Sequence, residues 1–408
     1  MWQTGGRDAR AGLPPALNII ALSGFAASLS TRALDPVLPR IAAEFTVPIT
    51  TAAGLAAVSA FTFAVVQPAI GALADIFGKA RLMIVCLALL GLASLLGAMA
   101  TSFELLFLCR ILAGIGSGGV FPVALGLTGD LVEPERRQVA IGRVLGGSMT
   151  GNLLGATASG VIGDVMGWRG VLTVLGLLVI VAALAVAFGF RGKPISAGAP
   201  MDFAGLRRSY RTIFSNPNAA ICFTAVLIEG TCVMGTFPYV AAFLHELGQE
   251  SLAVAGLVIA GFAVGGLIYT LTVGSLLPRL GVNGMMIAGG ALVGLQLAII
   301  AFGPSWQAQA ACFVAMGMGF YMLHGCIQVF ASELTETARG TAMSLHSFFF
   351  FIGQTTGPIA YGFGLGHLGK VPTLLIAGAT MLALGLVLAR ILKARPPADA
   401  SVGEPRLS

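Results

Sequence analysis

Apolar runs of about 20 residues recur along nearly the whole chain, separated by short polar segments. As a helix, such a run is long enough to cross the hydrocarbon core of a bilayer, which is about 30 Å thick. Only 10% of the 408 residues are charged and 57% are hydrophobic, whereas soluble domains carry about 25% charged residues. The pattern predicts an all-α integral membrane protein rather than an enzyme, with the lipid bilayer as its environment.

The runs predict about twelve transmembrane helices, and an even number of crossings places both termini on one side of the membrane. The predicted spans cover roughly residues 16–38, 51–73, 82–100, 104–127, 139–163, 170–190, 218–242, 253–275, 285–303, 307–331, 341–364 and 373–392.

The two halves of the chain repeat, because a shift of 203 residues (274 minus 71) aligns the segment Gly71–Gly78 with Gly274–Gly281. Transporters are often built from such repeats, here two pseudo-symmetric six-helix bundles. Between the bundles, apolar residues recur at helical spacing in a basic segment, which indicates either an amphipathic helix on the inner leaflet or a flexible linker. The predicted regions are an N-terminal tail (1–15), two bundles (16–190 and 218–392), a linker (191–217) and a disordered C-terminal tail (393–408).

Lysine and arginine are distributed unevenly between the two sets of loops. With the N-terminus placed in the cytoplasm, 18 of the 23 basic residues fall on the inner side, four (Arg32, Arg40, Arg169 and Lys370) fall on the outer side, and Arg110 lies within a span. Cytoplasmic loops carry an excess of Lys and Arg. The sequence therefore predicts a multi-pass protein of the inner (plasma) membrane with both tails cytoplasmic. The basic residues form no contiguous patch, so no nucleic-acid partner is expected.

The most specific motif is the short charged loop between the second and third spans, which contains Gly71, Asp75, Gly78, Lys79 and Arg81. Its spacing resembles the signature loop between helices 2 and 3 of the major facilitator superfamily of transporters. The resemblance implies the major facilitator fold, alternating access by rocking of two bundles, and a conformational latch formed by these five residues. A solvated turn carrying stop-transfer charges is the alternative interpretation.

Arg110 lies about two turns into the fourth span, where an arginine costs about 2.5–3.5 kcal/mol unless it is paired or reaches the interface. The pattern Arg110-x3-Gly114-x-Gly116 resembles helix 4 of the drug/proton antiporters of the superfamily. This resemblance implies that Arg110 takes part in proton coupling. The alternative is an arginine that extends to the outer membrane interface.

Three further residues are candidates for proton coupling. Arg32 and Asp35 share a helix face just before Pro36, and Asp35 could meet Arg110 near the outer mouth. Glu229 lies near the middle of the seventh span, where burial favours the neutral carboxyl. The alternatives are an interfacial Arg–Asp pair that ends the helix, and a Glu229 that is only a neutral hydrogen-bonding group.

Candidate contacts for a substrate in the cavity are Phe121, Asn152, His324, Gln328 and Gln354. Close helix packing is predicted at small residues, because these let helix backbones approach in lipid. Asn152 also replaces a proline that antiporters of the superfamily often carry in helix 5, which weakens the assignment to exporters. The predicted packing residues are Gly114, Gly116, Gly147, Gly151, Gly155, Gly353, Gly357 and Pro358.

Motifs for cofactors and metals are missing from the sequence. The six cysteines include no Cys-x-x-Cys pair, and there is no P-loop lysine motif. The sequence therefore predicts no metal and no cofactor, with a proton gradient as the energy source. The expected protein is a monomeric secondary transporter that exports a small amphiphilic or sugar-like compound in exchange for protons. A proton-coupled importer of a small metabolite is the alternative.

The latch interpretation predicts that Asp75→Asn abolishes transport, because the substitution removes the charge and keeps the size of the side chain. Transport assays on cells with equal amounts of the variant and the unmodified protein in the membrane check this. Transport at the unmodified rate would contradict a latch role for Asp75.

Overall fold

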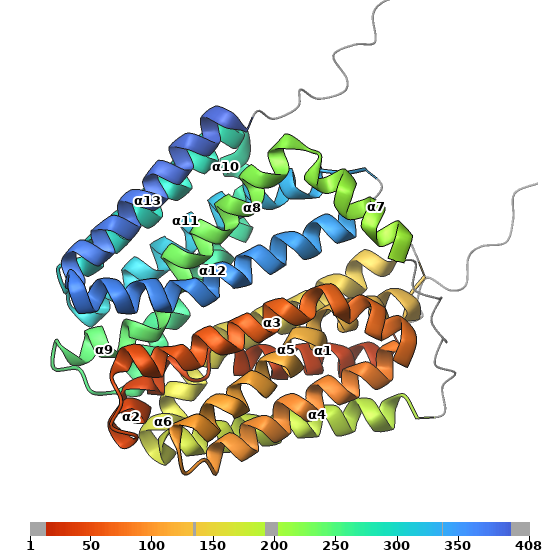
Figure 1. The fold of residues 1–408 in the computed structure, drawn as a ribbon, viewed down its shortest axis with the longest axis horizontal. Helices are drawn as coiled ribbons and strands as arrows, with labels where there is room; N and C mark the ends of the chain where they lie inside the picture. The colour runs from red at the N-terminus through yellow and green to blue at the C-terminus, as the bar shows by residue number, and fades with distance from the viewer. Residues whose placement is uncertain (1–13, 134–135, 192–202, 337, 393–408) are drawn as a thin grey trace, which may run out of the picture.

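The computed structural model describes residues 14–133, 136–191, 203–336 and 338–392, and this part of the chain contains helices and no strand. The helices form two bundles, α1–α6 and α8–α13, with α7 at one end between them (Figure 1). This arrangement matches the two bundles predicted from the repeat. The predicted tails lie outside the described residues, apart from residues 14 and 15 at the end of the N-terminal one.

The N-terminal bundle begins with a span that is interrupted near its end. The helix stops at Thr31, and a short 3-10 turn that contains Pro36 follows before the chain continues as α2. Proline removes a backbone donor, so the regular helix is broken at this point. The elements are α1 (Ala16–Thr31), η1 (Asp35–Val37), α2 (Leu38–Glu44), α3 (Ile49–Phe77), α4 (Lys79–Ala98), α5 (Phe103–Leu131) and α6 (Arg137–Gly189).

The C-terminal bundle begins in the same way. The α-helix of its first span ends at Glu229. The chain continues as a π-helical turn and then as a 3-10 turn that contains Pro238. The two halves thus repeat in structure as well as in sequence. The linker helix α7 (Phe203–Phe214) comes before this bundle. The elements of the bundle are α8 (Pro217–Glu229), η3 (Gly230–Met234), η4 (Phe237–Tyr239), α9 (Val240–His245), α10 (Leu252–Ala301), α11 (Trp306–Ser332), α12 (Arg339–His367) and α13 (Lys370–Ile391).

Two helices are long enough for two crossings each. With 53 and 50 residues, α6 and α10 have a contour of roughly 75–80 Å, more than twice the thickness of the hydrocarbon core. Each is broken by a glycine with positive φ, Gly167 (71°) and Gly281 (64°), a conformation that other residues rarely adopt. Gly281 and its repeat partner Gly78 (φ 82°) both end a helical segment.

Nine helical segments of the described chain are long and apolar enough to cross a membrane. Two of them are the double-length helices α6 and α10, each of which covers two predicted spans. The predicted span 341–364 lies in α12, which is 29 residues long and less apolar than these nine. The number of twelve crossings therefore stays a prediction.

The linker contains the helix α7. Its Ile213 is buried against the start of α8, whereas Arg207, Arg208 and Arg211 are exposed. The helix has one apolar and one basic face, as expected for an amphipathic segment. Residues 192–202 of the predicted linker lie outside the described residues.

The seven predicted packing glycines all lie against the backbone of a neighbouring segment. A Cβ added at Gly116 would lie 2.7 Å from the carbonyl oxygen of Cys86, and one at Gly147 would lie 2.7 Å from that of Ala21. Because real Cβ atoms do not approach this closely, a larger side chain would push the helices apart. The eighth predicted packing residue, Pro358, lies inside α12, and its carbonyl accepts a hydrogen bond of 2.7 Å from the Tyr239 hydroxyl.

Alanine substitutions at two glycines of α6 test the importance of close packing. Gly151→Ala should lower the stability by about 1–3 kcal/mol, because its Cβ would overlap the backbone of α1 at Phe25. Gly146→Ala is the control, since nothing lies within 4 Å of its Cβ and alanine favours the helix by up to about 1 kcal/mol. Thermal unfolding of the purified variants in detergent measures both effects. Equal unfolding temperatures for the two variants would contradict the packing role.

Candidate functional site

A cavity of about 420 Å³ lies between the two bundles. Its size falls in the range of small-molecule binding sites. Helices α1, α3, α5 and α6 line one side, and the chain around η3 and η4 with α10, α11 and α12 lines the other. Among the described lining residues, Arg32 and His324 are the only members of the Asp, Glu, Lys, Arg and His types. Seven phenylalanines line the cavity: Phe63, Phe121, Phe237, Phe262, Phe320, Phe350 and Phe351.

Four of the five predicted substrate contacts line this cavity. They are Phe121 of α5, Asn152 of α6, His324 of α11 and Gln354 of α12. Gln328 of α11 is not among the residues that line it, and its side chain is exposed. The prediction for Gln328 is therefore not matched by its position.

Arg32 lies at the C-terminal end of α1 and joins the two bundles. Its Nη1 is 3.4 Å from Oδ2 of Asp35, which is 2% exposed. Its Nη2 donates to the Met234 sulfur at 2.8 Å, and the guanidinium carbon lies 4.4 Å from the centre of the Phe237 ring. Met234 and Phe237 belong to the C-terminal bundle, so the cation contacts both halves at the edge of the cavity.

Arg110 is 7% exposed in α5, so it does not extend freely to the interface. Its Nε donates to the Ser59 hydroxyl of α3 at 3.0 Å. A second, smaller cavity is lined by Arg32, Asp35 and Arg110 together. The structure thus brings these three predicted residues around one space, and it adds Ser59, which sequence reasoning missed.

Glu229 and His324 form a buried pair in the C-terminal bundle. The carboxylate oxygen Oε2 lies 2.7 Å from Nδ1 of His324, and Glu229 is 0% exposed. The His324 ring lies among Phe320, Phe350 and His346, with the centre of the His346 ring 5.0 Å away. Since His324 lines the cavity and Glu229 lies behind it, the pair can hold a proton at the cavity wall. The sequence indicated the two residues separately and gave no sign of their pairing.

The π-helical turn η3 follows Glu229 directly. Gly230, its first residue, lies against the backbone of α12 at Phe350. Because π-helical turns widen a helix locally and often occur at functional sites, this break is consistent with a functional role for the end of α8.

The predicted latch is described only in part. The surroundings of Gly71 and the side chain of Asp75 lie outside the described part of the structure. Gly78 separates α3 from α4, and Arg81 is exposed. The Lys79 ammonium lies 2.7 Å from a carboxylate oxygen of Asp130 on α5, a partner that the sequence did not indicate.

The two bundles are joined at the end of the molecule that contains α2 and α9, which we call the α2–α9 end. Asp164 of α6 accepts hydrogen bonds from the backbone amides of Leu252 and Ala253 at 2.9 Å and from the Ser251 hydroxyl at 2.8 Å. These groups form the N-terminus of α10 in the other bundle. The carboxylate thus caps a helix across the interface, where a negative charge is favourable.

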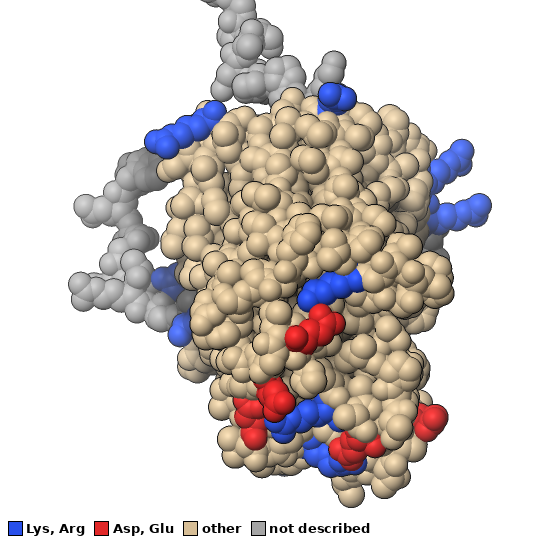
Figure 2. All heavy atoms as spheres, turned by 90° about the vertical axis from the view of Figure 1, so that its left-hand side faces the viewer, with Lys and Arg blue, Asp and Glu red and all other residues tan. Residues whose placement is uncertain are grey.

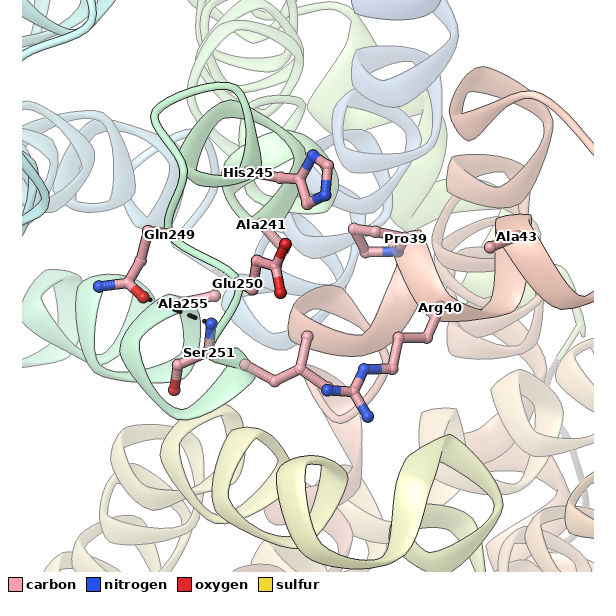
Figure 3. A pocket seen from close by; sticks show the side chains of 10 residues that line it. Pro39, Arg40, Ala43, Ala241, His245, Gln249, Glu250, Ser251 and Ala255 are labelled. Carbon is pink, nitrogen blue, oxygen red and sulfur yellow. Dashed lines mark hydrogen bonds between the residues drawn. The ribbon is translucent and has the colours of Figure 1, made fainter.

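The surface of the α2–α9 end carries acidic and basic side chains next to each other (Figure 2), including Lys370 with Glu246 and Arg169 with Glu44. A pocket of about 250 Å³ lies between α2, α9 and the start of α10, with Arg40 on one side and His245 and Glu250 on the other (Figure 3). Arg40 is also 3.6 Å from Asp164. This pocket marks the boundary of the two bundles at the surface.

Comparisons with known proteins agree with this architecture. The chain is 28% identical over 357 residues to the 3-(3-hydroxy-phenyl)propionate transporter of Escherichia coli K12, covering 81% of this chain and 83% of the relative. It is 23% identical over 351 residues to multidrug resistance protein 1 of Bacillus subtilis 168 (85% and 88%). It is 28% identical over 186 residues to the chloramphenicol resistance protein of Streptomyces lividans (46% of each chain).

Solved structures share the fold. The nucleoside transporter NupG superimposes with a TM-score of 0.77 at 14% identity, covering 93% of this chain and all of that one. A bacterial homologue of the lysosomal transporter Spinster, in an inward-facing and unoccupied conformation, gives 0.70 at 19% identity (93% and 96%). The family model of the Major Facilitator Superfamily matches residues 20–253 and 246–407. The chain therefore belongs to the major facilitator superfamily and is a multi-pass membrane transporter, not an enzyme.

Proposed function

We propose that this protein is a proton-coupled secondary transporter that moves a small amphiphilic compound by alternating access between its two bundles. The main observation behind the proposal is the contact between the fully buried Glu229 and His324, which lines the central cavity. Gain or loss of one proton by this pair changes the charge beside a bound substrate. Ionisable residues within a membrane are costly, and they commonly mark proton and substrate pathways. A proton gradient, with no cofactor, is the proposed energy source.

The cavity supports an amphiphilic aromatic substrate. Its wall is rich in phenylalanine, and the polar groups are few: Arg32, Asn152, His324 and Gln354. The compounds in the names of two relatives, chloramphenicol and 3-(3-hydroxy-phenyl)propionate, are small and contain an aromatic ring. These observations favour an aromatic compound over the sugar-like compound that the sequence left open.

Two directions of transport are candidates. Export in exchange for protons is supported by the Arg110-x3-Gly-x-Gly pattern and by the resistance proteins among the relatives. Uptake together with protons is favoured by one specific observation. The described lining of the cavity contains the cation Arg32 and no carboxylate, whereas an exporter of cationic drugs needs a negative charge in the cavity.

From the excess of Lys and Arg in the opposite set of loops, we infer that the α2–α9 end faces outward. In that orientation, the described conformation would be closed to the outside. The contacts of Asp164 with the N-terminus of α10 would then form part of the outer gate. These contacts have to break each time the cavity opens outward.

Replacement of Glu229 by glutamine tests proton coupling. Glu229→Gln should abolish transport driven by a pH gradient, because the side chain can no longer exchange a proton, while exchange of labelled for unlabelled substrate persists. Both activities are measured in proteoliposomes with labelled chloramphenicol and labelled 3-phenylpropionate. The direction of the pH gradient that drives transport distinguishes export from uptake. Glu333→Gln, at an exposed residue of the same bundle, is the control. Gradient-driven transport by Glu229→Gln at the unmodified rate would refute this role.

Removal of the Asp164 cap tests the outer gate. Asp164→Ala should destabilise the closed state by about 1 kcal/mol, which corresponds to a roughly fivefold larger open population. Labelling of a cysteine placed at Thr157, beside Gly256 of α10, with a membrane-impermeant maleimide in intact cells should accelerate by the same factor. Glu246→Ala breaks an ion pair within one bundle and should leave the rate unchanged. An unchanged rate in Asp164→Ala would exclude the gate role.

A further inference from the structure

We propose that the central cavity binds an aromatic compound with a single negative charge, and that the Arg32 guanidinium is the contact for its carboxylate. This inference rests on the proposed function only in taking the central cavity as the substrate site. It specifies the class of substrate, which the sequence and the fold leave open.

The first observation is that the one ion pair of Arg32 in the described structure, with Asp35, is long. A guanidinium has five N–H donors in a planar fork that suits a carboxylate. In the described structure, its carboxylate neighbour Asp35 lies at 3.4 Å, longer than the 2.7–2.9 Å typical of charge-assisted hydrogen bonds. Its other hydrogen bond goes to the sulfur of Met234, which is a weak acceptor. A carboxylate in the cavity would supply a closer anionic partner than Asp35.

The second observation is the charge of the site as a whole. Among the described residues that line the small cavity, Asp35 is the one carboxylate, and Arg32 and Arg110 are the two cations that share it. Across the central cavity, Glu229 and His324 are together neutral when the pair holds one proton. With Asp35 ionised and one proton on the pair, the described groups around the two cavities carry one excess positive charge. A substrate with one negative charge neutralises it, whereas a cationic substrate adds repulsion in a poorly solvated space.

The third observation is the position of the aromatic rings near Arg32. The guanidinium stacks on Phe237, whose ring centre is 5.1 Å from that of Phe262. Across the boundary between the bundles, the ring centres of Phe63 in α3 and Phe351 in α12 are 3.9 Å apart. All four rings line the cavity. A carboxylate at Arg32 would thus place an attached aromatic ring among side chains that pack well against it. A compound with several charges would lack further cations in the described lining.

Matched acids, amides and amines test this inference. The probes are 3-phenylpropionate, 3-phenylpropanamide and 3-phenylpropylamine, together with 2-naphthoate and 2-naphthamide for a larger ring. Binding to the purified full-length protein in detergent is measured by isothermal titration and by the shift in unfolding temperature. At least one acid should bind about tenfold or more tightly than its amide and more tightly than the amine, as expected for hydrogen bonds to a charged group.

Variants identify the contact. Arg32→Gln should remove the preference for the acid, and Arg32→Lys should retain part of it, since the charge remains but the planar fork is lost. Arg40→Gln, at an arginine of the outer pocket, is the control and should keep the full preference. The unfolding temperatures without ligand show whether each variant is folded, and the comparison of probes on the unmodified protein needs no variant.

Three results would overturn the inference: equal or tighter binding of an amide or amine, an unchanged preference in Arg32→Gln, or no binding by either acid. Binding at equilibrium requires no gradient, so its outcome is separate from that of proton coupling. If acids bind as expected and Glu229→Gln still transports along a pH gradient, the coupling role of Glu229 is wrong while the substrate class stands.

Discussion

Buried charge in a lipid-spanning bundle has to be met by groups from other helices, because the surrounding hydrocarbon offers no hydrogen-bonding partners. Arg110 of α5 contacts Ser59 of α3, and Glu229 of α8 contacts His324 of α11. Arg32 reaches from α1 to Met234 and Phe237 in the other bundle. These interactions determine which helix faces turn toward the centre of the molecule, and the central cavity lies between them.

The two sets of ionisable residues lie in different bundles. Arg32, Asp35 and Arg110 belong to the N-terminal bundle, whereas Glu229 and His324 belong to the C-terminal one. The cavity lies between them, with Arg32 on one side and His324 on the other. This arrangement suits alternating access, because occupancy and protonation can both act on the relative position of the bundles.

Within each bundle, the helices pack together mainly through small residues. The packing glycines let helix backbones approach to distances that no other residue allows. Such close packing favours movement of each bundle as a rigid unit. At the α2–α9 end, by contrast, Asp164 joins the bundles through directed hydrogen bonds. A gate needs contacts of this kind, because they can be broken and formed again without disturbing the helices.

The sequence by itself determined the membrane class, the repeat, the family and most of the helices. Hydrophobic length and glycine spacing are local properties, and the lipid environment leaves few folds that satisfy them. It also indicated Arg32, Asp35, Arg110 and Glu229, because charge is conspicuous within apolar runs.

Only the tertiary structure decided which of these residues meet. Glu229 and His324 are 95 positions apart, and Asp164 lies 88 positions from Leu252, so nothing local in the sequence connects them. Gln328 illustrates the converse, since a polar residue in a span can lie outside the cavity lining with its side chain exposed. Such pairings depend on how each helix is rotated about its axis, and that rotation is fixed by packing against neighbours rather than by local sequence.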